Sequence, residues 1–210
     1  MLIREGRVRA NGRLIEHVGE RVKLDAKISI SGQPSRRSAQ ATRVVIALNK
    51  PRGVVTTTKD PEGRTTVFQV LEEKGMTERL HAIGRLDLAS SGLLLFTNDS
   101  DLLNQLTDPV NGVPRKYVVV VRGRVTPEEI AGLDAHEIVI RKASGPESHL
   151  LVTLTQGKNR EIRNMFEEIG HEVTRLHRVE FGPISLGPLQ AGDWIDVSDL
   201  FSEKVSPVFS

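Results

Sequence analysis

"HAIGRLDLASSGLLLFTNDSD", which runs from His81 to Asp101, places two opposite charges directly before a strongly apolar run. Arg85 and Asp87 flank one leucine, and the run "LLLF" follows at residues 93–96. Such a run predicts a buried strand, and an isolated carboxylate beside it is costly. A guanidinium that pairs with the carboxylate keeps it ionised, and an ionised carboxylate in a partly dry cleft can act as a nucleophile or a base. Spacing alone favours a simpler role, in which the pair caps a turn.

Composition excludes several classes of protein. The chain has 210 residues, of which 38% are hydrophobic, and this suits one ordinary domain or one domain with a small appendage. No apolar run approaches the roughly 20 residues that span a bilayer, and the start "MLIREGRVRANG" lacks the apolar segment of a signal peptide. The absence of cysteine excludes disulfides and thiolate chemistry. We therefore expect a cytoplasmic protein that does not associate with membranes.

Charge is distributed unevenly along the chain. Residues 1–43 carry ten Lys and Arg against four Asp and Glu, whereas residues 44–210 carry nineteen against twenty-three. A basic end on a mildly acidic body is typical of a module that meets a polyanion, most simply a nucleic acid. A solvated basic tail has the same composition, and charge alone does not separate the two interpretations.

The basic end and the body differ in pattern. The segment "RVRANGRLI" alternates around Asn11-Gly12, which predicts a two-residue hairpin, and "KISISG" predicts a further strand. The stretch "SRRSAQATR" is small, polar and without periodicity, as linkers are. We therefore expect a small module over residues 1–34, a linker over 35–43 and a main domain over 44–210.

The main domain predicts many strands and a few helices. Strands are expected at 44–50, within 52–64, at 116–123 (central in its sheet), at 136–143 and 148–156, and twice within 172–187. Helices are expected at 65–75, at 100–109 with Ser100 as N-cap and Pro109 as terminator, at 126–133 and at 159–170. This irregular order predicts an α+β fold, with a largely antiparallel mixed sheet and flanking helices.

Several kinds of catalytic site find no support in the sequence. The six histidines are scattered without ligand spacing and cysteine is absent, so we predict no metal site. Neither a G-x-S-x-G elbow nor a phosphate-cradling G-x-x-x-x-G-K-[ST] loop occurs. Asp99 and Asp101 could be the paired carboxylates of a glycosidase, but they flank a helix start, where acids commonly act as caps. The capping role is the better interpretation.

Four segments of the main domain form an ordered set of motifs. In chain order they are "LNKPRGVVTT" (48–57), "GRLDLASSGLLLFTND" (84–99), "KYVV" (116–119) and "LTQGKNREIRNMFEEIGHEVTRLHRVEFGPISLG" (154–187). They resemble, in the same order, the four motifs of the RsuA-type ribosomal RNA pseudouridine synthases. A single GRLD would be a weak signal, whereas four ordered motifs over about 140 residues are specific. The resemblance implies the pseudouridine synthase fold.

The amino-terminal residues carry a second resemblance. "LIREGRVRANGRLIEHVGERVKLDAKISISGQ" resembles the second half of the ribosomal-protein-S-four-like RNA-binding domain, which precedes the catalytic domain in many of these enzymes. In that domain two short basic helices come before the hairpin. We therefore expect residues 1–34 to be a truncated RNA-binding domain that begins within the second helix.

The resemblance assigns roles to five residues. Asp87 matches the essential aspartate, which acts either as a nucleophile on the ribose or as a base at its 2′ position. Arg163 matches the arginine that pairs with this aspartate, and Tyr117 matches the tyrosine that stacks on the target base. Ile162 would form an apolar wall on the other side of the base, and Arg85 would contact the RNA or the backbone of the flipped nucleotide. Reaching the ribose requires that the nucleotide leave its stack, so base flipping is implied.

The expected function is the isomerisation of a specific uridine in ribosomal RNA, without cofactor or metal, by a monomeric enzyme. The segments "GRTTVFQVL" and "RVEFGPISLG" favour large-subunit RNA, by resemblance only. Lys50 is expected to be a structural or ion-pair residue. Two alternatives from other classes are a catalytically silent RNA-binding or ribosome-assembly protein with the same fold, and a glycoside hydrolase. The presence of Asp87, Tyr117 and Arg163 argues against the first, and the lack of a second convincing carboxylate argues against the other.

Overall fold

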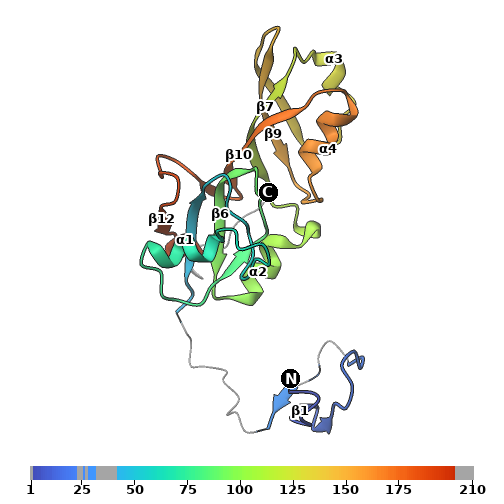
Figure 1. The fold of residues 1–210 in the computed structure, drawn as a ribbon. Helices are drawn as coiled ribbons and strands as arrows, with labels where there is room; N and C mark the ends of the chain where they lie inside the picture. Colours follow the sequence, from blue (N-terminus) through green and yellow to red (C-terminus); the bar gives the residue numbers. More distant parts are fainter. Residues whose placement is uncertain (1, 23–25, 27, 32–41, 202–210) are drawn as a thin grey trace. The chain divides into compact units, whose positions relative to one another are not determined.

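The chain forms two compact units in a computed structural model, Met1–Thr42 and Arg43–Ser210 (Figure 1). The structure describes residues 2–22, 26, 28–31 and 42–201. Most of the expected linker, residues 35–41, lies outside the described part.

The first unit is a three-stranded antiparallel sheet. It contains β1 (Val8–Ala10), β2 (Arg13–Leu14) and β3 (Ile28–Ile30), in the order β2-β1-β3. Asn11 and Gly12 join β1 to β2 with φ of 49° and 84°, the left-handed values that a two-residue turn of type I′ requires. The hairpin expected at Asn11-Gly12 is confirmed.

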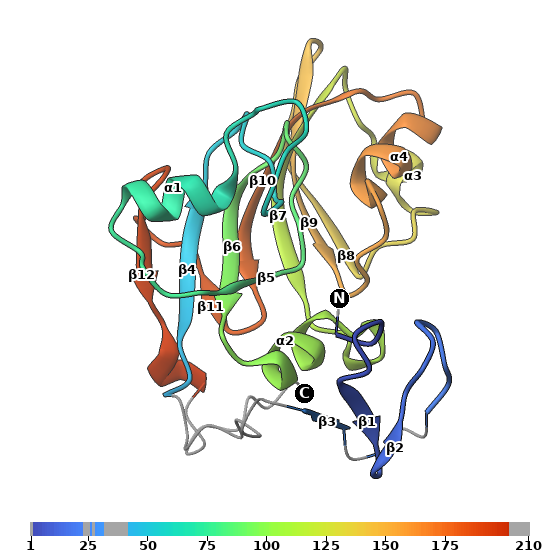
Figure 2. The same cartoon turned by 60° about the horizontal axis from the view of Figure 1, so that its bottom comes forward.

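The second unit is built on one large sheet (Figure 2). Its strands follow the order β12-β4-β6-β10-β7-β9-β8, with β5 paired to β6 and β11 paired to β10. The strands are β4 (Val45–Lys50), β5 (His81–Ile83), β6 (Ser91–Thr97), β7 (Arg115–Arg122), β8 (Glu137–Ala143), β9 (Glu147–Leu154), β10 (Val173–Phe181), β11 (Ile184–Ser185) and β12 (Trp194–Asp196). Every pairing is antiparallel except that of β6 with β10. The expected α+β class and the central position of β7 are confirmed.

Short helices cover both faces of this sheet. They are α1 (Val67–Glu73), α2 (Ser100–Thr107), α3 (Pro127–Ile130) and α4 (Glu161–Glu168), with 3₁₀ turns η1 (Pro109–Asn111) and η2 (Ser198–Phe201). Apolar residues of α1 and α4 join one hydrophobic core, whereas those of α2 and η2 join a second core. In β4 and β6 successive residues alternate between the two cores, which explains why these strands read as continuous apolar runs.

Two expectations about local structure are wrong. The cap of α2 is Asp99 and not Ser100, because the Asp99 carboxylate accepts hydrogen bonds from the backbone N–H groups of Asp101 and Leu102, at 2.9 and 3.2 Å. The strand expected within residues 52–64 is absent, and only Val55 forms an isolated bridge, with Thr66 beyond that segment. Turns closed around Asp60, which accepts hydrogen bonds from its neighbour Arg64, replace the strand.

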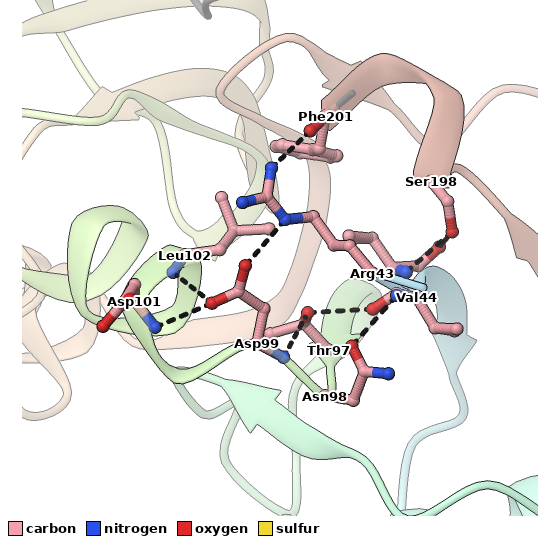
Figure 3. Close-up of polar contacts among 10 residues, drawn as sticks. Arg43, Val44, Thr97, Asn98, Asp99, Asp101, Leu102, Ser198 and Phe201 are labelled. Atoms are coloured by element: carbon pink, nitrogen blue, oxygen red, sulfur yellow. Dashed lines mark hydrogen bonds and ion pairs between the residues drawn. The ribbon is translucent and has the colours of Figure 1, made fainter. Parts of the chain in front are cut away.

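Figure 3 shows how the beginning of the second unit and Phe201, the last residue that the structure describes, are joined at α2. Arg43 Nε donates to Asp99 Oδ2 at 2.7 Å and Arg43 Nη1 donates to the carbonyl of Phe201 at 2.6 Å. Burial of Asp99 raises its pKa, but the helix N–H groups and Arg43 outweigh this effect and lower the pKa overall. The same carboxylate therefore caps a helix and holds Arg43, which in turn binds the carbonyl of Phe201.

Removing this carboxylate is expected to destabilise the second unit. Asp99→Ala should lower the free energy of unfolding by about 1–2 kcal/mol, because the cap and the partner of Arg43 are both lost. Asp101→Ala is the matched control, since Asp101 is exposed in the same helical turn. Urea denaturation of both variants measures the effect, and equal losses in the two would contradict this role of Asp99.

Gly92 permits the one parallel pairing of the sheet. It pairs with Lys50 of β4 on one side and with Arg178 of β10 on the other, at a φ of +102°. A Cβ at this position would lie 2.2 Å from the Arg178 carbonyl oxygen, and that neighbour is backbone that cannot rotate away. Only glycine therefore fits between these strands.

Gly92→Ala is expected to cost at least about 3 kcal/mol of unfolding free energy, from left-handed strain plus a backbone clash. Gly75→Ala provides the control, because Gly75 has a φ of +84° but no atom lies within 4 Å of the place that an alanine methyl group would occupy. That variant should lose only about 1 kcal/mol of unfolding free energy. Urea denaturation measures both variants, and similar losses would show that the close contact at Gly92 does not affect stability.

Candidate active site

Asp87 lies in the loop between β5 and β6, and the backbone of this loop is held on several sides. The Ser90 N–H donates to the Asp87 carbonyl at 3.0 Å, which closes a turn. The Gly53 N–H donates to the Leu88 carbonyl at 2.8 Å, and the Thr56 hydroxyl donates to the Leu86 carbonyl at 2.9 Å. These bonds fix a carboxylate whose side chain remains 32% exposed.

Two arginines at the start of α4 face this carboxylate. Arg163 Nε lies 3.5 Å from Asp87 Oδ2, and Arg160 Nη1 lies 3.7 Å from the same oxygen. The Arg163 side chain is 11% exposed and also donates to the Val173 carbonyl at 2.9 Å, whereas the Arg160 side chain is 52% exposed. Burial lowers the pKa of Arg163 and the charge of Asp87 opposes that shift. Arg163 is thus the anchored partner of Asp87.

The residues singled out in the sequence come together at one cavity. Its lining includes Arg85, Asp87, Tyr117 and Ile162, and Arg163 reaches it through its contact with Asp87. Tyr117 of β7 and Ile162 of α4 are 8% and 3% exposed, so both are largely built into the core. Arg85 is exposed at the rim and makes none of the ion pairs of Asp87 in the described part of the chain.

Sequence reasoning missed four further cations near Asp87. Lys158 and Arg160 line the same cavity, and an adjoining cavity that also borders Asp87 adds Arg115 and Arg178. The segment "GKNREIR" could have indicated Lys158 and Arg160, because it places three cations at the start of a predicted helix. Arg115 and Arg178 lie on strands, and nothing in the neighbouring sequence distinguishes them from other strand residues.

Lys50 binds the backbone of the loop that carries Asp87. Its side chain is fully buried, and its ammonium donates to the carbonyls of Ser90 and Pro51, at 2.8 and 3.0 Å. Burial lowers the pKa of Lys50 to about 8, although the charge of Asp87 favours the protonated form. The structural role expected for Lys50 agrees with these contacts.

Lys50 should make stability depend on pH in a definite window. In the folded protein it releases its proton near pH 8, whereas its ordinary pKa is 10.5. Between these values the unfolded chain binds more protons, so the free energy of unfolding should rise with pH, by up to roughly 3 kcal/mol from this group. Urea denaturation below pH 8 and near pH 10 tests the prediction.

The rise should disappear in Lys50→Met and persist in Lys142→Met, because Lys142 is exposed on β8. Comparing the variants removes the contribution of other groups that titrate at high pH. A parent protein and a Lys50→Met variant with the same pH dependence would show that the Lys50 ammonium is not desolvated.

The described residues hold no cluster of three histidine or acidic side chains that could bind a metal ion. Within the same residues, no helix has both the length and the apolar character needed to cross a bilayer.

Residues 44–168 match the family model described as RNA pseudouridylate synthase, and the chain belongs to this family. The family expected from the four motifs is confirmed.

Among the relatives, the chain is similar to ribosomal large subunit pseudouridine synthase B of Pseudomonas aeruginosa, with 39% identity over 97% of this chain and 57% of that protein. It is 35% identical to the protein of the same name from Bacillus subtilis, over 91% of this chain and 82% of that protein. The chain thus spans little more than half the length of the Pseudomonas relative. A solved structure described as a crystal structure of pseudouridylate synthase has the same fold, with a TM-score of 0.63 at 24% identity over 93% of this chain and 87% of that one.

Proposed function

We propose that the protein converts a specific uridine of ribosomal RNA, in the large subunit, into pseudouridine without a cofactor. The observation that carries the proposal is the Asp87 carboxylate, held by Arg163 in a cavity that Tyr117 and Ile162 also line. The names of the relatives from Pseudomonas aeruginosa and Bacillus subtilis support the choice of large-subunit RNA. Action in the cytoplasm, as a monomer and without membrane contact, completes the proposal.

The reaction requires little beyond a well-placed carboxylate. The bond from ribose C1′ to N1 of uracil breaks, the base turns, and C5 bonds to C1′. The C5 proton passes to solvent, and N1 takes up one proton in exchange. No other atom enters or leaves, so positioning is the main demand on the protein. Asp87 acts either as a nucleophile at the ribose or as a base at its 2′ position, and its pairing with Arg163 suits both roles because both need an ionised carboxylate.

The surrounding side chains fit a flipped uridine. Tyr117 offers a flat ring for stacking, and Ile162 offers an apolar surface in the same cavity. Both residues are largely buried, so a base inside a folded RNA must leave its stack to reach them. Arg85, exposed at the rim, is placed to contact the RNA backbone. The basic residues 1–34 would add RNA contacts as a partial RNA-binding domain.

Asp87→Asn is expected to abolish the activity while leaving the fold intact, because an amide of the same shape lacks the charge. The assay is tritium release from ribosomal RNA labelled at C5 of its uridines, and the loss should be roughly a thousandfold or more. Asp101→Asn is the control, since Asp101 is an exposed carboxylate outside the cavity, and it should release tritium as the parent does.

The assay also tests the alternative of a silent RNA-binding protein. Binding of the labelled RNA by the folded parent without any tritium release would support that alternative and contradict the proposed isomerase. Equal release by the parent and by Asp87→Asn would show that a different group performs the chemistry.

A further inference from the structure

Two buried arginines stand beside the candidate active site. Arg178 of β10 is 2% exposed and Arg115 of β7 is 8% exposed. Arg178 Nε donates to the Leu93 carbonyl at 2.7 Å, but its buried Nη2 has no acceptor in the part of the chain that the structure describes. The guanidinium of Arg115 donates to backbone carbonyls only, those of Leu106, Val113, Thr155 and Gln156. A buried donor that lacks an acceptor is expensive, so the free Nη2 requires an explanation.

Both guanidinium groups lie against the ring of Phe181. Their guanidinium carbons lie 4.8 Å (Arg115) and 5.0 Å (Arg178) from the centre of the Phe181 ring. Within the described residues, neither forms an ion pair with a carboxylate. Burial lowers the pKa of Arg115 overall. Tyr117 and the charge of Glu161 act to raise this pKa, and the charge of Arg178 acts to lower it. Two buried like charges without an ion-pair partner are unfavourable, and an anion in the cavity that both arginines line would offset the cost.

One cavity joins these arginines to the reacting groups. It is lined by Asp87 and Tyr117 together with Arg115 and Arg178. Its charged lining consists of five cations, namely Arg85, Arg115, Lys158, Arg160 and Arg178, and the single carboxylate of Asp87. A nucleotide whose base lies against Tyr117 carries its phosphates on the same ribose, so they come within reach of this cavity. The planar fork of arginine matches a phosphate better than any other side chain does.

We propose that Arg178, with Arg115 beside it, binds a backbone phosphate that adjoins the target uridine. This subsite rests on the proposed function, since it requires RNA at Asp87. By holding the phosphate next to the ribose, it positions C1′ for the carboxylate. Arg178 therefore binds the substrate directly. Its role differs from that of Arg163, which pairs with the Asp87 carboxylate.

The test removes the charge from one phosphate at a time. The probe is an RNA hairpin that carries the mapped target uridine, with a neutral methylphosphonate either 5′ or 3′ to it. In the parent protein, one of these substitutions should lower kcat/KM of tritium release by about tenfold to a hundredfold. In Arg178→Gln the same substitution should have little further effect, because the contact has already been lost.

Control variants separate this role from a structural one. Arg175→Gln changes an exposed arginine of the same strand, and it should keep the parent's sensitivity to the methylphosphonate. If Arg178→Gln does not fold, Arg178→Lys keeps a cation that can reach the Leu93 carbonyl but loses the fork, and it should show a reduced sensitivity.

Each outcome has a distinct meaning. A parent insensitive to both methylphosphonates, or a variant as sensitive as the parent, would overturn the subsite while leaving the isomerase in place. A parent inactive on the unmodified hairpin and on ribosomal RNA would instead contradict the proposed function.

Discussion

The pairing of Asp87 with Arg163 is the interaction on which the candidate active site depends. It joins the loop before β6 to the helix α4, and β7, β8 and β9 lie between them in the sequence. A carboxylate beside a buried strand is tolerated because a largely buried guanidinium lies 3.5 Å away and is itself anchored to the Val173 carbonyl. The parallel pairing of β6 with β10 brings these segments together, and Gly92 permits that pairing.

The sequence predicted much of the fold because the signals were local. The Asn11-Gly12 turn, the caps at Thr66 and Thr126 and the apolar runs of β6 and β7 each depend on neighbours within a few residues. The errors came where polar side chains compete with the backbone. Asp60 turned an expected strand into turns, and Asp99 took the cap position expected for Ser100.

The site was less accessible to sequence reasoning, since its contacts are set by long-range pairing. Spacing suggested Arg85 as the partner of Asp87, whereas the carboxylate faces Arg160 and Arg163. The Arg163 pairing could be anticipated only through the family resemblance. Arg178 could not be anticipated at all, because its importance depends on lying buried across from Gly92, with a free donor near the cavity.

The most direct test of this account is a double-mutant cycle between Asp87 and Arg163, measured as the free energy of unfolding in urea. We expect Asp87→Asn and Arg163→Met to show a coupling energy of about 1 kcal/mol or more. The same cycle with Arg160→Met should give a coupling energy near zero, because the Arg160 side chain is half exposed. Additive losses for Asp87 and Arg163, or a larger coupling to Arg160, would contradict the claim that Arg163 holds the carboxylate.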